Sequence, residues 1–237
     1  MNDVIAKKYW NQEFGDSPQF LNAYFGAMIE ENCVCLTSEC GLLVALSVFA
    51  RYEYVFCSQK LSMAYLTGVM TLPAFRNLGY MRQNVTSALN KMNKAGYDIC
   101  VLIPANAQLA IAYENLGFAS VFTTQKPLTL EKTVLHSDKD ILLHKRLGYD
   151  LNKPYTHGNG MIRIVNPKRI MSHYAHFHSK VSFSFTLKDN LIANNNISYS
   201  INCGKISKNK DTYKIISVQE LSAFLFKDSY MDCMFDE

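Results

Sequence analysis

A glycine turn between two apolar segments is the part of this sequence best suited to bind a phosphate group. The turn spans residues 76–81 and reads Arg-Asn-Leu-Gly-Tyr-Met. Gly79 lets backbone N–H groups approach an anion closely, and the positive N-terminal end of the helix expected after it favours phosphate there. Arg76 adds a side chain that can donate two hydrogen bonds to a phosphate. These residues therefore predict a phosphate-binding turn.

The segments on either side of this turn must hold it in place. Residues 61–71 have the apolar and β-branched character of a strand, and residues 81–95 carry four apolar side chains on one helical face. A glycine ends this helix, and residues 97–103 then form a nearly continuous apolar strand followed by a short helix at 106–115. Residues 67–118 are thus predicted to form a βαβα unit.

Three motifs in this unit resemble one protein family. They are Gly-Val-x-Thr-x-Pro at residues 68–73, Arg-x-x-Gly-x-Met at 76–81 and Tyr-Glu-Asn-Leu-Gly-Phe at 113–118. Together they resemble the GNAT superfamily of acetyl-CoA-dependent N-acetyltransferases, and within it the enhanced intracellular survival (Eis) branch. Met81 stands where the superfamily usually has glycine or alanine, and the Eis branch tolerates a larger residue there. The resemblance implies an α+β GNAT fold, in which a mixed, mostly antiparallel sheet contains the βαβα unit.

The same resemblance implies where acetyl-CoA binds. In GNAT proteins the turn holds the coenzyme A pyrophosphate, and the strand before it separates from its neighbour to admit the pantetheine arm. A backbone N–H of Met70 or its neighbour would polarise the thioester carbonyl. The cofactor-binding residues implied in this sequence are Val69, Met70, Thr71, Arg76, Asn77, Leu78, Gly79, Tyr80, Met81 and Arg82.

Tyr113 is the general acid that the resemblance implies. GNAT enzymes often use the tyrosine four residues before the glycine of Tyr-x-x-x-Gly-Phe to protonate the departing thiolate, and a phenol with a pKa of about 10 can do this without being ionised. The alternative is that Tyr113 is an ordinary core aromatic residue.

The general base is less visible. Residues 61–71 contain no carboxylate, and Glu53 is the nearest one. In the Eis branch the C-terminal carboxylate enters the active site, which makes Glu237 the candidate base by resemblance. The alternative for Glu237 is a solvated tail, because this chain continues past the aromatic residue with which such chains often finish.

Two helices and a β-meander are expected before the turn. Residues 3–14 read as the first helix, and Ser17 as an N-cap with Pro18 at the first helical position predicts the start of the second. The aromatic side chains of both helices suit a core, and by the resemblance the same helices line the acceptor cleft. Residues 32–36 and 42–56 read as strands of an antiparallel meander that leads into the central strand.

The resemblance divides the chain into a GNAT domain at residues 1–125, a basic linker at 126–154 and a sterol-carrier-like C-terminal domain at 155–237. Larger Eis-like proteins carry a second GNAT-like domain between these parts, and 237 residues leave no room for it. The sequence does not give the oligomeric state; a homo-oligomer is one way to cover apolar surface that the missing middle domain would leave exposed.

Composition restricts the class of protein. With 49% hydrophobic and 19% charged residues, the chain is expected to be globular. Seven cysteines without a Cys-x-x-Cys motif favour a reducing, cytoplasmic environment over a disulfide framework. The longest apolar run, residues 41–50, is far shorter than the ~20 residues of a membrane-spanning helix, so no membrane span is predicted.

The positions of the charged residues and histidines bear on whether the protein binds nucleic acid or a metal ion. Residues 126–180 contain ten Lys and Arg against four Asp and Glu, in a chain whose formal net charge is +4. These basic residues are scattered among apolar ones without an RNA-binding aromatic motif, so no nucleic-acid partner is predicted. His173, His176 and His178 do not share one helical face, so no metal site is predicted.

The sequence therefore predicts an acetyl-CoA-dependent N-acetyltransferase that acts on a primary amine of a small molecule or peptide. Because no nucleophilic cysteine accompanies the turn, direct attack of the amine on acetyl-CoA is expected. The alternative is a non-catalytic protein that keeps the fold to bind coenzyme A, an apolar ligand or a partner.

Overall fold

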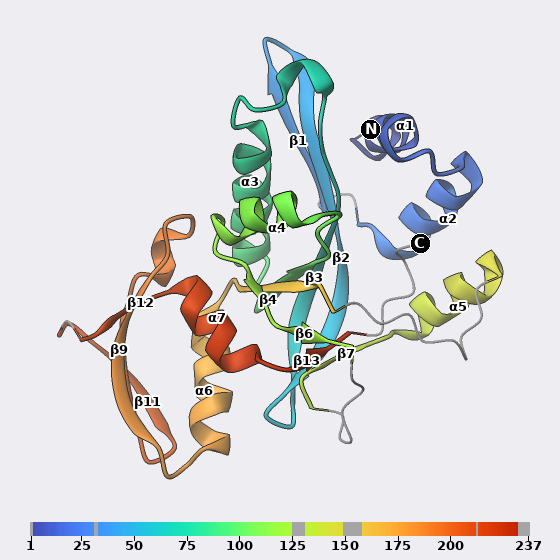
Figure 1. The fold of residues 1–237 in the computed structure, drawn as a ribbon. Coiled ribbons are helices and arrows are strands. Elements are labelled where there is room, and N and C mark those ends of the chain that lie inside the picture. Colours follow the sequence, from blue (N-terminus) through green and yellow to red (C-terminus); the bar gives the residue numbers. More distant parts are fainter. Residues whose placement is uncertain (1, 31–32, 125–130, 149–157, 212, 232–237) are drawn as a thin grey trace.

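The chain folds around one large sheet and a second, smaller one (Figure 1). The computed structural model describes residues 2–30, 33–124, 131–148, 158–211 and 213–231. Within them, no helix is long and apolar enough to cross a membrane. The large sheet has nine strands in the order β5-β8-β4-β3-β2-β7-β13-β6, with β1 also paired to β2. Its strands are β1 (Val34–Glu39), β2 (Leu42–Phe56), β3 (Gln59–Thr71), β4 (Ile99–Leu102), β5 (Ala119–Ser120), β6 (Phe122–Thr123), β7 (Thr133–Leu135), β8 (Met161–Ile164) and β13 (Ser229–Tyr230).

The long hairpin of β2 and β3 is the centre of the large sheet. Its two strands pair antiparallel from Ala45 and Thr71 to Phe56 and Gln59, and most side chains of β2 are buried. Residues that alternate along β3 point to opposite faces, so Met63 and Tyr65 join one apolar cluster while Ala64 and Leu66 join another. Both faces of the sheet are therefore covered.

Helices cover both faces of the large sheet with their apolar sides. On one face lies α3 (Tyr80–Lys94), whose buried Val85, Ala88, Leu89 and Met92 pack against β2, β3 and β4. On the other face lie α1 (Asn2–Phe14), α2 (Pro18–Met28) and α5 (Asp138–Leu147) (Figure 1). The predicted start of α2 is confirmed, because the Ser17 hydroxyl accepts a hydrogen bond from the Phe20 N–H and Pro18 is the first helical residue.

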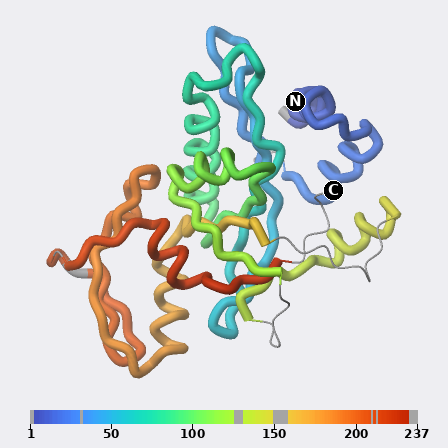
Figure 2. The backbone as a smooth tube through the Cα atoms, in the orientation of Figure 1, coloured from blue at the N-terminus to red at the C-terminus, as the bar shows by residue number. Residues whose placement is uncertain are grey.

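The smaller sheet has four strands in the order β11-β10-β9-β12. Stacked rings of Phe185 and Tyr199, with centroids 5.5 Å apart, contribute to its buried face. Its elements, with the two helices that connect it to the large sheet, are α6 (Pro167–Phe177), β9 (Ser182–Lys188), β10 (Ser198–Asn202), β11 (Lys205–Asn209), β12 (Ile215–Ser217) and α7 (Val218–Phe226). Figure 2 shows the chain after α7 returning to the large sheet, where β13 pairs with β6 and β7.

The large sheet extends beyond the predicted GNAT segment. From the predicted linker it takes β7, and from the predicted C-terminal domain it takes β8 and β13. In particular, β8 pairs antiparallel with both β4 and β5, so it lies inside the sheet. The expected domain boundaries at residues 125 and 155 stay predictions, as does the sterol-carrier likeness of the C-terminal part. The smaller sheet begins at β9.

Candidate functional site

An opening between β3 and β4 forms the centre of the candidate site. The two strands pair in parallel over three residue pairs only, from Met63 with Ile99 to Tyr65 with Val101. Beyond that point β4 ends at Leu102, while β3 continues to Thr71. Among the described residues, no strand therefore lies beside the side of β3 that faces β4 over its last six residues, Leu66 to Thr71. This is the separation that the sequence resemblance implies.

A β-bulge lies on β3 inside this opening. Three steps along β3, from Thr67 to Met70, oppose two steps along β2, so β3 carries one extra residue. Gly68 lies in the bulge with a φ of +57°. A bulge turns backbone groups out of the regular ladder, which makes N–H groups available beside the opening. The unpaired residues of the bulge are Gly68 and Val69, directly before Met70, whose backbone N–H is implied for thioester binding.

Trp10 of α1 closes the bulge from the other face. A Cβ on Gly68 would lie 2.4 Å from the Trp10 ring, so only glycine fits at this position. The Trp10 indole N–H donates to Asp16 at 2.7 Å and fixes the ring. The sequence showed Trp10 only as a helical aromatic residue, because its contact with a glycine fifty-eight positions away is not local.

The predicted phosphate turn follows β3 directly. A short 3₁₀ helix (Pro73–Phe75) leads into it, and Asn77 and Gly79 have positive φ values of 63° and 86°. Gly79 is the N-cap of α3 and supplies no side chain to cap the first N–H groups of the helix. A Cβ on Gly79 would meet nothing within 4 Å, so the turn is open toward solvent. The N-terminus of α3 is thus free to accept an anion.

Arg76 is near this turn but is engaged in other contacts. Its Nε donates to the Thr71 carbonyl at 3.0 Å, and its Nη2 forms an ion pair with Glu13 of α1. Arg82, in the first turn of α3, donates to the Asn115 carbonyl at 3.3 Å. Because the Arg76 side chain is half exposed, its ion pair is worth no more than about 1 kcal/mol and can exchange for a phosphate.

Tyr113 lies on α4 (Ala107–Glu114), which packs in the same apolar cluster as α3. Its side chain is 5% exposed, and its ring contacts Phe118 edge-on with centroids 5.7 Å apart. Its hydroxyl makes no hydrogen bond within the described part of the chain. Burial, followed by the nearby Cys100, raises the pKa of Tyr113. A buried phenol that stays protonated has the proton that a general acid must donate.

Comparisons with known proteins agree with this geometry. A family model described as an acetyltransferase (GNAT) domain matches residues 5–121. The match covers just under half of the chain and identifies residues 5–121 as a GNAT acetyltransferase domain. The Gly68 bulge, the opening and the turn before α3 all lie within this GNAT domain. The domain is that of an acyltransferase enzyme, and the cosubstrate of GNAT acetyltransferases is acetyl-CoA.

Solved structures share the fold of the GNAT domain and of the parts that follow it. The chain is similar to Eis1 from Mycobacterium abscessus, with 11% identity and a TM-score of 0.69 over 94% of this chain and 86% of that one. A GCN5-related N-acetyltransferase from Anabaena variabilis has 12% identity and a TM-score of 0.63 over 94% and 87%. A probable N-acyltransferase from Enterococcus faecalis has 10% identity and a TM-score of 0.68 over 92% and 86%. No curated protein matches the chain.

The residues of the GNAT domain fit acetyl-CoA. The opening beside β3 leaves backbone groups for an extended pantetheine arm, and the uncapped start of α3 suits a pyrophosphate. The open space around Gly79 leaves room for that group. The lining positions implied by the sequence, Val69 to Thr71 and Arg76 to Arg82, follow one another along this path. Their individual contacts with acetyl-CoA stay predictions.

Of the two carboxylates considered as bases, Glu53 does not join this site. Glu53 forms an ion pair with Lys60 at 2.6 Å near the β2–β3 turn, and its side chain is half exposed. It pairs across the hairpin with Ser62, on the far side of the point where β3 and β4 separate. Glu237 lies outside the described residues, so its assignment as the base stays a prediction.

A buried polar cluster that the sequence reading missed lies on the face of α1, α2 and α5. Asp140 of α5 is fully buried, contacts Nδ1 of His136 through its carboxylate and accepts a hydrogen bond from the Tyr52 hydroxyl at 3.3 Å. Its backbone carbonyl is 2.6 Å from Nδ1 of His144. The Tyr52 ring contacts Tyr65, the last β3 residue paired with β4, at a centroid distance of 6.1 Å. In the sequence, the sign of this cluster was the spacing of four residues from His136 to Asp140 and from Asp140 to His144.

Proposed function

We propose that this enzyme transfers the acetyl group of acetyl-CoA to a primary amine of a small molecule or peptide. The observation that carries the proposal is the opening beside β3, which contains the Gly68 bulge and leads directly to the uncapped N-terminus of α3. This arrangement suits a thioester with a long phosphate-bearing arm. The acceptor would approach from the face of α1 and α2, where Trp10 contacts the bulge.

Each group in the site has a task in this reaction. N–H groups at Gly68 to Met70 hydrogen-bond the thioester oxygen as negative charge develops on it. The amine nitrogen attacks the carbonyl carbon, the C–S bond breaks, and the Tyr113 hydroxyl gives its proton to the sulfur. The proton that the amine loses restores the Tyr113 phenol through solvent. Burial raises the pKa of Tyr113, so the phenol is neutral in the folded protein and carries a proton when the C–S bond breaks.

Calorimetric titration with acetyl-CoA tests the cofactor site. Gly79→Glu places a carboxylate where the pyrophosphate is expected, and we expect affinity to fall by at least about 100-fold. Gly96→Glu is the matched control, since Gly96 follows the other end of α3, also has a positive φ of 81°, and also has open space around it. Equal affinity in both variants would contradict the assignment of the turn.

Thiol release tests the transfer itself. Acetyl-CoA is mixed with a panel of polyamines, aminoglycosides, aromatic amines and lysine peptides, and free coenzyme A is measured. We expect turnover with one class, and a kcat about 10²–10⁴-fold lower in Tyr113→Phe. Tight binding of acetyl-CoA without turnover of any amine would overturn the amine-transfer proposal and favour a coenzyme A-binding module.

A further inference from the structure

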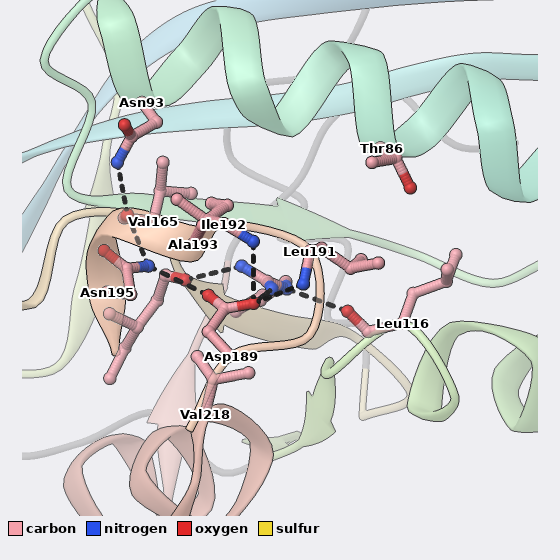
Figure 3. Close-up of polar contacts among 12 residues, drawn as sticks. Thr86, Asn93, Leu116, Val165, Asp189, Leu191, Ile192, Ala193, Asn195 and Val218 are labelled. Atoms are coloured by element: carbon pink, nitrogen blue, oxygen red, sulfur yellow. Dashed lines mark hydrogen bonds and ion pairs between the residues drawn. The ribbon is translucent and has the colours of Figure 1, made fainter. Parts of the chain in front are cut away.

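A buried arginine outside the GNAT family match contacts the turn that ends α4. Arg163 lies on β8 and is fully buried. Its Nε donates to the Leu116 carbonyl at 2.8 Å, its Nη1 to the Ile164 carbonyl at 2.9 Å and its Nη2 to Asp189 at 2.5 Å. Figure 3 shows this line of contacts between Leu116 and Asp189. The guanidinium therefore joins three separate parts of the chain.

The turn that Arg163 contacts also carries Tyr113. The Tyr113 carbonyl accepts hydrogen bonds from the N–H groups of Leu116 at 2.9 Å and Phe118 at 3.1 Å. Gly117, between them, has a φ of +85°, and a Cβ there would lie 3.1 Å from Arg163 Nε and 2.7 Å from Val218. The turn is thus packed directly on the guanidinium and on Val218.

The other end of the guanidinium is held just as firmly. Asp189 follows β9 and is 3% exposed. Besides Arg163, its carboxylate accepts hydrogen bonds from the N–H groups of Leu191 at 2.9 Å and Ile192 at 3.1 Å, and from the Asn195 amide at 2.9 Å. These contacts, drawn in Figure 3, fix the carboxylate in one orientation. Arg163 is therefore anchored by a loop of the smaller sheet.

We infer that Arg163 is a positioning residue for Tyr113, which it holds through the Leu116 carbonyl against the Asp189 loop. The inference rests on the proposed role of Tyr113. Because the Tyr113 hydroxyl has no hydrogen bond of its own within the described residues, its place depends on ring packing and on the backbone turn. A shift of about 1 Å in a reacting group can cost 10²-fold in rate. The smaller sheet thereby takes part in the reaction without touching substrate.

A double-mutant cycle between Arg163→Lys and Tyr113→Phe tests this. One ammonium group cannot replace a fork that contacts Leu116, Ile164 and Asp189 together. With acetyl-CoA and the amine of highest turnover in the panel, we expect kcat to fall roughly tenfold in Arg163→Lys, within the range that misplacement causes. We expect KM for acetyl-CoA to stay within about twofold, since the α3 turn is untouched.

The cycle separates positioning from mere stability. In the Tyr113→Phe background, Arg163→Lys should lower kcat by less than about twofold, because residues that act as a unit are not additive. An equal loss in both backgrounds would overturn the inference while leaving the proposed function intact. If Tyr113→Phe alone keeps full kcat, both the general-acid role and the inference fail.

Two further variants control for folding. Arg169→Lys is the matched control, since Arg169 forms an ion pair with Asp98 elsewhere in the fold, and its kcat should not change. If Arg163→Lys does not fold, as judged by circular dichroism, Asp189→Asn replaces it. That variant keeps the Leu116 contact but frees the guanidinium, and we expect a kcat loss that again disappears in the Tyr113→Phe background. A loss that persists there would overturn the inference.

Discussion

The two ends of the candidate site are built in opposite ways. At the α3 turn, Gly79 is open to solvent and Leu78 is 66% exposed. Arg76, itself half exposed, is held by an ion pair with Glu13 and a hydrogen bond to the Thr71 carbonyl. At the α4 turn, Arg163 and Asp189 are buried and their hydrogen bonds are made. The first end can exchange its partners for a ligand. The second end is suited to hold a reacting group in place. Substitutions at the α3 turn should therefore change ligand binding, and substitutions at the α4 turn should change stability.

Asp189→Ala should have the largest effect on stability. It leaves the Arg163 guanidinium buried without its charge partner, and breaking a buried pair costs about 3–5 kcal/mol of unfolding free energy. Denaturant unfolding measures the loss, with Glu13→Ala as the control at the exposed end. The Glu13 variant should lose no more than about 1 kcal/mol. Similar losses of unfolding free energy in the two variants would show that the buried Arg163–Asp189 pair contributes no more to stability than the exposed Arg76–Glu13 pair.

Alanine at the two turn glycines should sharpen the same contrast. Gly117 and Gly79 have nearly equal φ values of 85° and 86°, so the backbone strain of a Cβ is the same in both. In Gly117→Ala the new carbon also meets Val218 at 2.7 Å, which adds an overpacking cost of about 1–3 kcal/mol. Thermal unfolding of the two variants compares them. A Gly79→Ala variant that is the less stable of the two would contradict the packing described at Gly117.

The same contrast decides what the sequence could reveal. The α3 turn was predictable because its glycine, its arginine and the amphipathic helix after it are neighbours in the chain. The βαβα unit and the start of α2 followed from local signals for the same reason. The link from Tyr113 to Arg163 and Asp189 was not predictable, because it joins α4, β8 and the loop after β9 through tertiary packing.

The expected domain organisation shows the limit of local signals. Residues 161–164 form strand β8, but no local feature of the sequence indicates that this strand lies between β4 and β5. The same holds for Trp10, whose role at Gly68 depends on how α1 packs on the sheet.

Glu13→Gln should have a modest effect on acetyl-CoA binding. The substitution removes the charge that pairs with Arg76 and leaves the guanidinium more available for phosphate. We expect the Kd for acetyl-CoA to fall about two- to fivefold at low salt and the difference to shrink as salt screens exposed charges. Lys7, which pairs with Asp3 on the same helix, offers the control Asp3→Asn, whose Kd should not change. Weaker binding in Glu13→Gln would mean that Arg76 must be held by Glu13 to contact the ligand.

Tyr113→Phe should cause the smallest change of all when the ionisation of the tyrosine side chains is measured. Burial raises its pKa above the ordinary value of about 10, so the folded protein keeps the phenol neutral where an exposed tyrosine begins to ionise. The unfolded chain ionises first, so this group's contribution to stability is fully present below about pH 10 and is lost as pH rises toward the raised folded pKa. Ultraviolet titration of tyrosinate should therefore give the same curve for the wild type and Tyr113→Phe up to about pH 10. A difference of one tyrosinate below that pH would place the Tyr113 hydroxyl in water. The contrast between the closed α4 turn and the open α3 turn would then be wrong at its central residue.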